Sequence, residues 1–515
     1  MDELTLPDML NAATAYVDAN VAAGRGAKTA FFYREQQITY QDVLDQVNRT
    51  GNALRAMGLE VEQRVALLLL DGPEFVYSFF GAMKIGAVAV PMNTLLRPGD
   101  YAYLLNDSRA KVLIVSEPLL PQIEAIRHEL SHLRQIIVVG KAGPHLSYDR
   151  LLAAASSALE ATPMSKDDMA FWLYSSGSTG FPKGAVHLHH DMFYVSDLVG
   201  KQVMQITEAD RTFSAAKLFF AYGLGNNMYI PMRLGAAGVL LPDRPTPEAV
   251  FDTITRYHPT VFYGVPTLYA QMLQVEDALS RYDLSTLRLC VSAGESLPPE
   301  IFRRWHDRFG LEICDMIGST EALYVFIGNR PGRVRVGSTG KVLPGFEAKI
   351  VDDDGQEVGV DKVGTLLVQG DSTAPFYWNK HRKSQQTMLG AWLNTGDKFR
   401  RDAEGFYWYA GRSDDMLKVG GIWVSPIEVE NTLLEHEAVL EAAVVGAKDS
   451  DALIKPKAYV VLRQGYIASA QLTTELQDFV KTKLAPYKYP RWIECIAELP
   501  KTATGKIQRF KLREF

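Results

Sequence analysis

Short apolar runs alternate with segments of helical apolar spacing up to about residue 337, and this alternation limits the possible folds most. Strand-like runs stand at residues 65–70, 87–91 and 111–116. The segments between them repeat apolar residues at helical intervals, as Leu44, Val47 and Leu54 do earlier in the chain. Strands joined by helices form mostly parallel sheets that are covered on both faces. The sequence therefore predicts an α/β fold. We expect further strands at 135–139, 169–174, 238–241 and 260–264, with a helix at 247–257.

The alternation of strand-like runs and helical segments ends near Gly337, and the pattern changes again after Arg412. Short alternating strands separated by Asp/Gly turns predict a small β-barrel-like unit from about residue 337. After Arg412, an α+β pattern with helices at 426–435 and 470–483 begins. The polar turn Ser413-Asp414-Asp415 is a suitable hinge. We expect a large N-terminal domain over 1–412 and a smaller, mobile C-terminal domain over 413–515.

Size and charge exclude several classes of protein. A chain of 515 residues is too long for one core. Its net charge of −6 argues against a dedicated nucleic-acid or anionic-membrane binder. We find no apolar stretch near the ~20 residues that span a bilayer. The three cysteines form no CxxC pair, which fits a reducing compartment. We expect a cytoplasmic protein without nucleic-acid or membrane partners.

A loop rich in hydroxyls and glycines follows the apolar run 170–173. Its sequence from residue 174 to 184 is YSSGSTGFPKG. Glycines let backbone N–H groups approach an anion, hydroxyls donate hydrogen bonds, and Lys183 adds positive charge. The loop is no Walker motif, because Gly184 follows Lys183 where that motif has Ser or Thr. Nor does Ser178 stand in a Gly-x-Ser-x-Gly elbow. We interpret it as a phosphate-binding loop; a solvated linker is the alternative.

Four further motifs follow in a recognisable order. They are IGSTE at 317–321, NTGD at 394–397, GRSDD at 411–415 and PKTATGKIQR at 500–509. Together with the loop, they make the chain resemble the adenylate-forming (acyl-CoA synthetase) superfamily along essentially its whole length. The chain most resembles benzoate–CoA ligases.

The resemblance implies a site for ATP and Mg²⁺. Thr320 would bind the nucleotide phosphates, Glu321 would hold Mg²⁺, and Lys506 would reach the substrate carboxylate and the α-phosphate. A carboxylate oxygen suits Mg²⁺. Many members of the superfamily have an aromatic residue where this chain has Ile317. The implied catalytic residues are Lys506, Thr320, Glu321 and Lys183; the implied ATP/AMP-binding residues are Ser175, Ser176, Gly177, Ser178, Thr179, Gly180, Ala293, Gly294, Glu295, Asp315, Met316, Ile317, Gly318, Ser319, Thr320, Asp397, Arg412 and Lys506.

The resemblance also implies an aryl pocket and a second step with coenzyme A. Asp414 would be the hinge, and the segment of Lys418, Gly420 and Gly421 would enter the site after the C-terminal domain rotates. Flat aromatic walls suit a planar substrate ring. Many benzoate-type members have His at Tyr324, so a phenol there could shorten the pocket or bond a hydroxylated ring. The implied substrate-binding residues are Phe220, Ala221, Tyr222, Gly318, Tyr324 and Val325.

Three histidines near the loop, His187, His189 and His190, resemble a metal-binding pattern. Their spacing, at an expected strand-to-helix junction, favours packing instead.

We therefore predict an AMP-forming aryl-acid–CoA ligase that converts benzoate or a substituted benzoate, with ATP, Mg²⁺ and coenzyme A, into the thioester through an acyl-adenylate. A homodimer is left open. The alternatives are a stand-alone adenylation enzyme for another carboxylic acid and a non-catalytic carboxylate-binding protein of the same fold.

Overall fold

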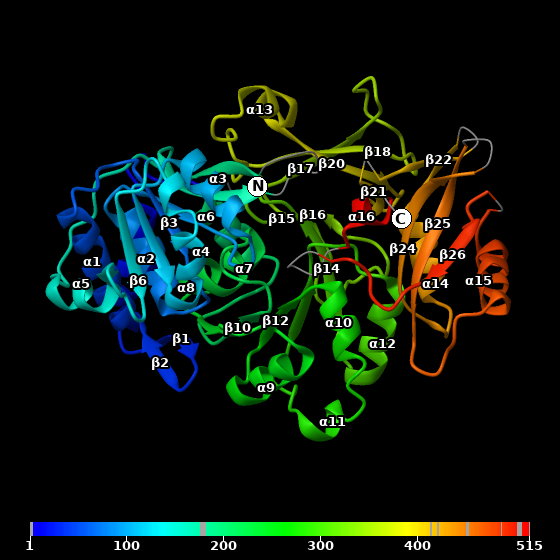
Figure 1. The fold of residues 1–515 in the computed structure, drawn as a ribbon, viewed down its shortest axis with the longest axis horizontal. Helices are drawn as coiled ribbons and strands as arrows, with labels where there is room; N and C mark the ends of the chain where they lie inside the picture. Colours follow the sequence, from blue (N-terminus) through cyan, green and yellow to red (C-terminus); the bar gives the residue numbers. More distant parts are fainter. Residues whose placement is uncertain are drawn as a thin grey trace.

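The computed structural model describes residues 4–175, 182–412, 415–419, 422–449, 453–485, 487–501 and 507–513. The chain forms two large sheets, a smaller antiparallel sheet and a separate C-terminal domain (Figure 1). The predicted α/β fold with a β-rich unit and a smaller α+β domain is confirmed. Among the described residues, no helix is both long and apolar enough to cross a membrane.

The first large sheet has seven strands in the order β7-β6-β5-β3-β4-β8-β9. All neighbouring strands are parallel except β8 and β9, which form an antiparallel pair around the loop that follows Ser175. Its strands are β3 (Arg64–Leu68), β4 (Val88–Pro91), β5 (Val112–Ser116), β6 (Gln135–Val139), β7 (Leu146–Ser147), β8 (Met169–Ser175) and β9 (Lys183–Leu188).

The second large sheet has nine strands in the order β16-β15-β14-β13-β12-β10-β11-β1-β2. Its six central strands are parallel, and the pairs at both ends are antiparallel. Its strands are β1 (Thr29–Tyr33), β2 (Gln36–Thr39), β10 (Arg211–Ser214), β11 (Ala237–Leu240), β12 (Val261–Gly264), β13 (Leu289–Ser292), β14 (Ile313–Gly318), β15 (Val325–Gly328) and β16 (Lys341–Val342).

Helices cover both faces of each sheet, as the fully apolar strands require. One hydrophobic cluster joins a face of each sheet through α1 (Tyr40–Ala56) and α2 (Pro73–Lys84). The opposite face of the nine-stranded sheet packs on α9 (Pro247–Tyr257), α10 (Pro266–Met272) and α12 (Pro299–Phe309). The opposite face of the seven-stranded sheet packs on α3 (Pro98–Ser108). The two sheets are thereby held as one body, with their carboxyl ends available for a site.

Local sequence explains where particular helices begin and end. Thr246 caps α9 by accepting a hydrogen bond from Ala249 N–H, and Pro247 occupies its first turn. The helix ends at His258, which takes a left-handed conformation at φ 47°. Near the N-terminus, the chain forms two π-helical turns, Thr14–Asp18 and Val21–Arg25. Gly24 interrupts the second turn with φ 80°, which glycine adopts without strain.

The β-rich unit is an antiparallel sheet of five strands. Its edge strand β21 pairs with the long strand β20, so that Asp397 lies opposite Arg412. Its members are β17 (Glu347–Val351), β18 (Gly364–Gln369), β19 (Met388–Leu389), β20 (Trp392–Arg401) and β21 (Tyr407–Arg412).

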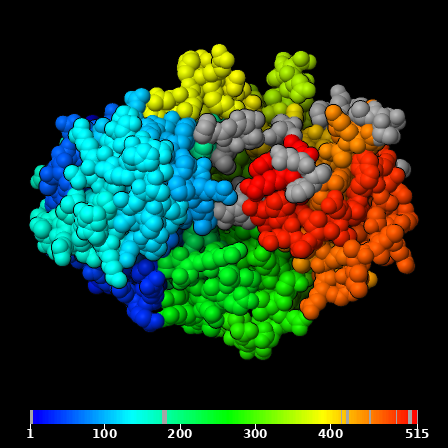
Figure 2. Space-filling model, in the orientation of Figure 1, coloured from blue at the N-terminus to red at the C-terminus, as the bar shows by residue number. Residues whose placement is uncertain are grey.

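The C-terminal domain has its own sheet and core. Strands β24 (Val439–Lys448), β25 (Ile454–Leu462) and β26 (Trp492–Cys495) pack against α14 (Pro426–Leu434) and α15 (Ala470–Lys483). The two hydrophobic clusters of this domain contain described residues from Leu417 onward only. Figure 2 shows it, orange to red, at one end of the long axis.

Candidate active site

Glu321 lies at the meeting point of both large sheets. It belongs to the turn that follows β14 of the nine-stranded sheet. Its Oε1 accepts a hydrogen bond of 2.9 Å from Ser175 Oγ, at the end of β8 in the other sheet. The same Oε1 accepts a second bond, 2.7 Å long, from the hydroxyl of Tyr377. Among the described residues, both hydrogen bonds to this carboxylate end on Oε1. Oε2 is therefore available as a ligand for a cation.

Lys183 begins β9, next to this carboxylate. Partial burial lowers the pKa of its ammonium, while the charge of Glu321 acts in the opposite direction. Its Nζ lies 5.0 Å from the centre of the Tyr377 ring. The residues around Tyr377 extend the sheet beside β9, because Trp378 N–H donates to the Gly184 carbonyl over 2.8 Å. Lys183, Tyr377 and Glu321 thus form one cluster.

The predicted nucleotide-binding residues 315–319 lie in β14 and directly after it, immediately before this turn. Asp315 and Met316 are buried, whereas Ile317, Gly318 and Ser319 are partly exposed. Burial raises the pKa of the Asp315 carboxyl well above its usual value. Among the described residues, its buried Oδ1 has no hydrogen-bond partner. A Cβ at Gly318 would lie 2.2 Å from the Tyr324 carbonyl oxygen, which explains why glycine stands there.

The predicted adenine segment Ala293-Gly294-Glu295 follows β13, the strand beside β14. The two segments leave neighbouring parallel strands at the same edge of the sheet, where α/β proteins bind ligands. Gly294 has φ 94°. Glu295 Oε1 accepts a 3.0 Å hydrogen bond from Ile507 N–H, which joins this edge to the C-terminal domain.

Asp397 and Arg412 form an ion pair across β20 and β21. Arg412 Nη1 donates to Asp397 Oδ1 over 3.1 Å and to the Thr395 carbonyl over 3.3 Å. The charge of Arg412 contributes to the lowered pKa of Lys183, which places the pair within electrostatic range of the Glu321 cluster. The two predicted ribose residues are thus brought together.

The predicted aryl residues also come together. Phe220 precedes the short helix α7 (Ala221–Leu224), which carries Ala221 and Tyr222. The ring of Tyr222 stacks on that of Tyr324, with centroids 6.3 Å apart. Tyr324 is 2 % exposed, and its hydroxyl donates to Asn226 Oδ1. Of the two roles expected for this phenol, the hydrogen bond to Asn226 favours shortening the pocket. Val325, the first residue of β15, is equally buried.

Several residues at the site carry no sequence signal that our motifs use. Asp71 follows β3, and its Oδ1 accepts a 3.0 Å bond from Leu218 N–H at the start of the aryl segment. Burial raises the pKa of Asp71 to about 6, against the opposing charge of Lys217. Tyr377 and Asn226 were missed as well, because each acts through a contact distant in sequence.

Several predicted residues lie outside the described part of the chain: Ser176, Gly177, Ser178, Thr179, Gly180, Asp414, Gly420, Gly421 and Lys506. Lys418 lies in β22 (Leu417–Val419), and its side chain is not described. Described residues on either side of the segment 502–506 form ion pairs within the C-terminal domain. Lys501 pairs with Glu441 at 2.7 Å, and Arg509 pairs with Glu430 at 2.8 Å.

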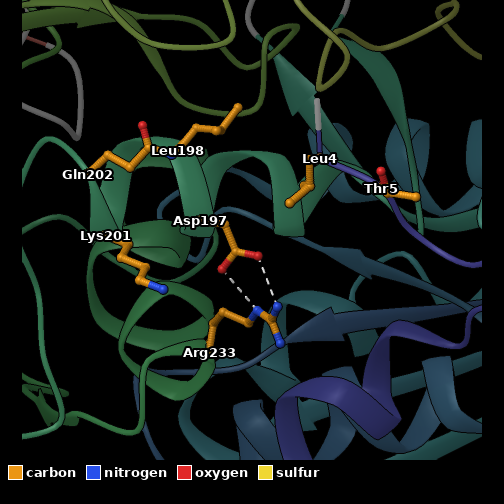
Figure 3. A pocket seen from close by; sticks show the side chains of 7 residues that line it. All are labelled: Leu4, Thr5, Asp197, Leu198, Lys201, Gln202 and Arg233. Atoms are coloured by element: carbon orange, nitrogen blue, oxygen red, sulfur yellow. Dashed lines mark hydrogen bonds and ion pairs between the residues drawn. The ribbon is translucent and has the colours of Figure 1, made fainter. Parts of the chain in front are cut away.

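A cavity of about 400 Å³ lies elsewhere on the N-terminal domain (Figure 3). Arg233 and Asp197 face one another in it through two hydrogen bonds of 2.9 and 3.1 Å. None of its lining residues belongs to the site described above, so the ion pair there is a structural feature. The lining residues are Leu4, Thr5, Asp197, Leu198, Lys201, Gln202 and Arg233.

Comparison with known proteins agrees with this arrangement. Residues 18–378 match the model of the AMP-binding enzyme family, and residues 428–506 match the AMP-binding enzyme C-terminal domain. The chain is 51% identical to a benzoate–CoA ligase of Thauera aromatica over 99% of this chain and 97% of the relative. It is 47% identical to a 4-hydroxybenzoate–CoA/benzoate–CoA ligase of Rhodopseudomonas palustris, over 98% and 94% of the two chains.

Solved structures extend the agreement to the whole fold. An anthranilate CoA ligase in complex with anthranoyl-AMP is 47% identical, with a TM-score of 0.95 over 99% of this chain and 98% of that one. A benzoate CoA ligase from Burkholderia xenovorans is 44% identical, with a TM-score of 0.91 over 98% and 100% of the two chains. The chain therefore belongs to the AMP-binding enzyme family.

Proposed function

We propose that this protein is an ATP-dependent, AMP-forming ligase that joins benzoate or a substituted benzoate to coenzyme A. The observation that carries the proposal is the convergence of Ser175 and Tyr377 on Glu321, three residues before Tyr324, whose ring stacks on Tyr222. This arrangement places a carboxylate that suits a cation, and through it the phosphates of ATP, three residues from an aromatic wall that suits an aryl acid. The names of the relatives support the same class of substrate.

In the first step, a carboxylate oxygen of the acid attacks the α-phosphorus of ATP. The bond to the β-phosphate breaks, pyrophosphate leaves, and an acyl-adenylate forms. Negative charge shifts on the phosphates, so cations and hydrogen-bond donors lower the barrier. Lys183, Thr320 and Lys506 supply such groups. Asp397 and Arg412 hold the ribose, and the segment 293–295 with residues 315–319 holds the adenine.

Glu321 fits a role as the Mg²⁺ ligand. Among the described residues, no group of three or more acidic, histidine or cysteine side chains forms a metal cage. A single carboxylate whose second oxygen accepts no hydrogen bond from the described residues suits Mg²⁺, which keeps several waters and binds ATP phosphates at the same time. When bound, the ion would neutralise charge on those phosphates. Ser175 and Tyr377 orient the carboxylate for this contact.

In the second step, the thiol of coenzyme A attacks the acyl carbon, loses its proton, and releases AMP. We place the domain boundary at 412/413 and the hinge at Asp414, with Lys418, Gly420 and Gly421 entering the site. The separate cores on either side of this boundary support independent movement of the C-terminal domain. A cytoplasmic location and a homodimer stay predictions.

The test is a two-step assay with a panel of acids: benzoate, its hydroxy-, amino- and halo-derivatives, and short aliphatic acids. We expect acid-dependent ATP–pyrophosphate exchange, and release of AMP with thioester only when coenzyme A is added. Exchange without any thioester would instead identify a stand-alone adenylation enzyme. Preference for hexanoate over every aromatic acid would overturn the aryl pocket but not adenylation.

The variant Lys506→Ala separates the two steps. It should abolish most acyl-adenylate formation, because the cation near the α-phosphate is lost. Thioester formation from supplied acyl-adenylate should persist, since that step uses the other domain arrangement. Equal loss of both half-reactions would contradict the assignment of Lys506.

A further inference from the structure

The turn that carries Thr320 and Glu321 adopts a conformation that has to be held in place. Leu323 is fully buried with φ 65°, in the left-handed region that leucine rarely occupies. Its N–H donates to the Thr320 carbonyl over 3.1 Å. The next two carbonyls are also bonded from outside the turn, Glu321 O by Ala374 N–H and Ala322 O by Ser372 Oγ. Such fixed strain at a site positions reacting groups.

The Thr320 carbonyl accepts one more hydrogen bond, from a buried histidine. His187 Nε2 lies 2.8 Å from this oxygen, and its Nδ1 lies 2.8 Å from Asp191 Oδ2. A carbonyl oxygen has no hydrogen to give, so Nε2 must carry one. Asp191 Oδ2 also accepts from Leu188 N–H. Asp191 therefore fixes the ring in the orientation that directs Nε2–H at Thr320.

His187 also belongs to the strand that begins with Lys183. Residues two apart on a strand face the same side, so Lys183, Ala185 and His187 share one face of β9. Lys183 acts on the Glu321 carboxylate through its charge, and His187 bonds the carbonyl of Thr320. One strand thus acts on the turn in two ways, through the charge of Lys183 and through the hydrogen bond of His187. The ring of His187 further stacks on Phe171 of β8, with centroids 5.2 Å apart.

We propose that His187, oriented by Asp191, is a positioning residue that holds the Thr320–Glu321 turn in register with Lys183 for binding MgATP. The inference rests on the proposed roles of Thr320 and Glu321. It changes our interpretation of this histidine from packing alone to fixing the site. His189, two residues later, differs, because its Nδ1 accepts a hydrogen bond from Ala12 N–H instead.

The test compares two substitutions at this position. His187→Leu removes the donor, and we expect the dissociation constant for MgATP, measured by calorimetry without acid, to rise about tenfold. His187→Gln can place an amide N–H near the position of Nε2. Its dissociation constant for MgATP should stay within about threefold of the wild-type value, because the restored hydrogen bond recovers most of the tenfold change. Rescue by glutamine identifies the donor as the reason for the effect.

Two further variants keep the test decisive. If His187→Leu does not fold, Asp191→Asn replaces it, and weaker MgATP binding with unchanged KM for the acid is expected. The matched control is His189→Leu, which removes another buried histidine close in sequence. It should lower the melting temperature but leave the affinity for MgATP unchanged.

The outcomes separate this inference from the proposed function. If His187→Leu has a lower melting temperature yet binds MgATP with the wild-type affinity, the histidine has only a structural role and the inference fails. The variant Glu321→Gln distinguishes a failure of the inference from a failure of the proposed function. If Glu321→Gln binds MgATP more weakly while His187→Leu binds it normally, only the inference about His187 is overturned. If Glu321→Gln also binds MgATP and forms acyl-adenylate normally, the assignment of the turn itself is wrong.

Discussion

The hydroxyl of Tyr377 donates a 2.7 Å hydrogen bond to Glu321 Oε1, across 56 positions of sequence. Burial raises the pKa of this tyrosine, and the neighbouring Glu321 carboxylate raises it further. The hydroxyl therefore stays protonated at any pH at which the enzyme would work, and remains a donor. It shares Oε1 with Ser175 Oγ, and no other described residue donates to the second oxygen of Glu321, which suits a cation.

We predict that Tyr377→Phe lowers kcat/KM for ATP by about tenfold, because a hydrogen bond to a charged group is worth about 1.5 kcal/mol or more. The required Mg²⁺ concentration should rise at the same time, since the carboxylate loses one of the two hydrogen bonds that orient it. Initial rates of pyrophosphate exchange across a Mg²⁺ titration measure both effects. The same change at Tyr103, whose hydroxyl donates to the Pro182 carbonyl, is the control and should leave the Mg²⁺ requirement unaltered.

The acyl pocket yields a prediction about substrate size. Tyr324→Ala removes a ring that stacks on Tyr222. The same ring packs closely on Gly225, where an added Cβ would lie 2.7 Å from it. We expect the variant to accept bulkier ring-substituted benzoates and to lose rate with benzoate itself. Removing a large buried side chain should also destabilise the protein by about 3 kcal/mol or more.

Tyr324→Phe is the matched control, because it keeps the ring and loses only the hydroxyl. It should preserve the size preference, although Asn226 Oδ1 loses its donor. Competition between benzoate and a bulkier analogue in the thioester assay gives the selectivity. An unchanged preference in Tyr324→Ala would place the end of the pocket elsewhere.

Much of the fold was predictable from the sequence, because its signals are local. The predicted helix 247–257 matches α9, and 470–483 matches α15, since capping residues and apolar spacing act within a few positions. Asp397 and Arg412, which the motifs assign to one site, are opposite residues of one strand pair.

The contacts that hold the site were not predictable in the same way. Tyr377 reaches Glu321, His187 reaches Thr320, and Tyr324 reaches Asn226 through side chains that meet only after the two sheets have packed. The periodicity of apolar residues in the sequence does not predict such contacts. The histidine cluster shows the difficulty, since its pattern indicated packing or metal binding and could not reveal a carbonyl 133 positions away.

Asp71 gives a prediction for the pH dependence of stability. Its pKa is raised to about 6 in the folded protein, above the ordinary value of 3.8 that applies when unfolded. Between these values the folded state binds more protons, so this residue makes stability fall as pH rises. From pH 4.5 to 7.5 the loss should be about 2 kcal/mol.

Asp71→Asn should remove this contribution while its side-chain oxygen can still accept from Leu218 N–H. Urea unfolding of both proteins at pH 4.5 and 7.5 measures the difference. We expect the variant to gain stability relative to the wild type as pH rises. A constant difference at the two pH values would show that Asp71 titrates alike in the folded and unfolded chain.

The last prediction concerns the ion pair that anchors the C-terminal motif. Arg509 donates to both oxygens of Glu430, and Oε1 of Glu430 also accepts from Val444 N–H. Burial would lower the pKa of Arg509, but the Glu430 charge outweighs it and keeps the pKa raised. Glu430→Gln leaves the buried cation without its partner, which should destabilise the C-terminal domain by about 3 kcal/mol.

The control for this variant is Asp478→Asn, which breaks an exposed pair with Lys481 and should cost less than about 1 kcal/mol. Because Arg509 follows Lys506 by three residues, Glu430→Gln should also slow acyl-adenylate formation at temperatures where the domain remains folded. Thioester formation from supplied acyl-adenylate should be spared, since Lys506 serves only the first step. If both half-reactions fall equally, the ion pair supports the domain as a whole rather than the placement of the lysine.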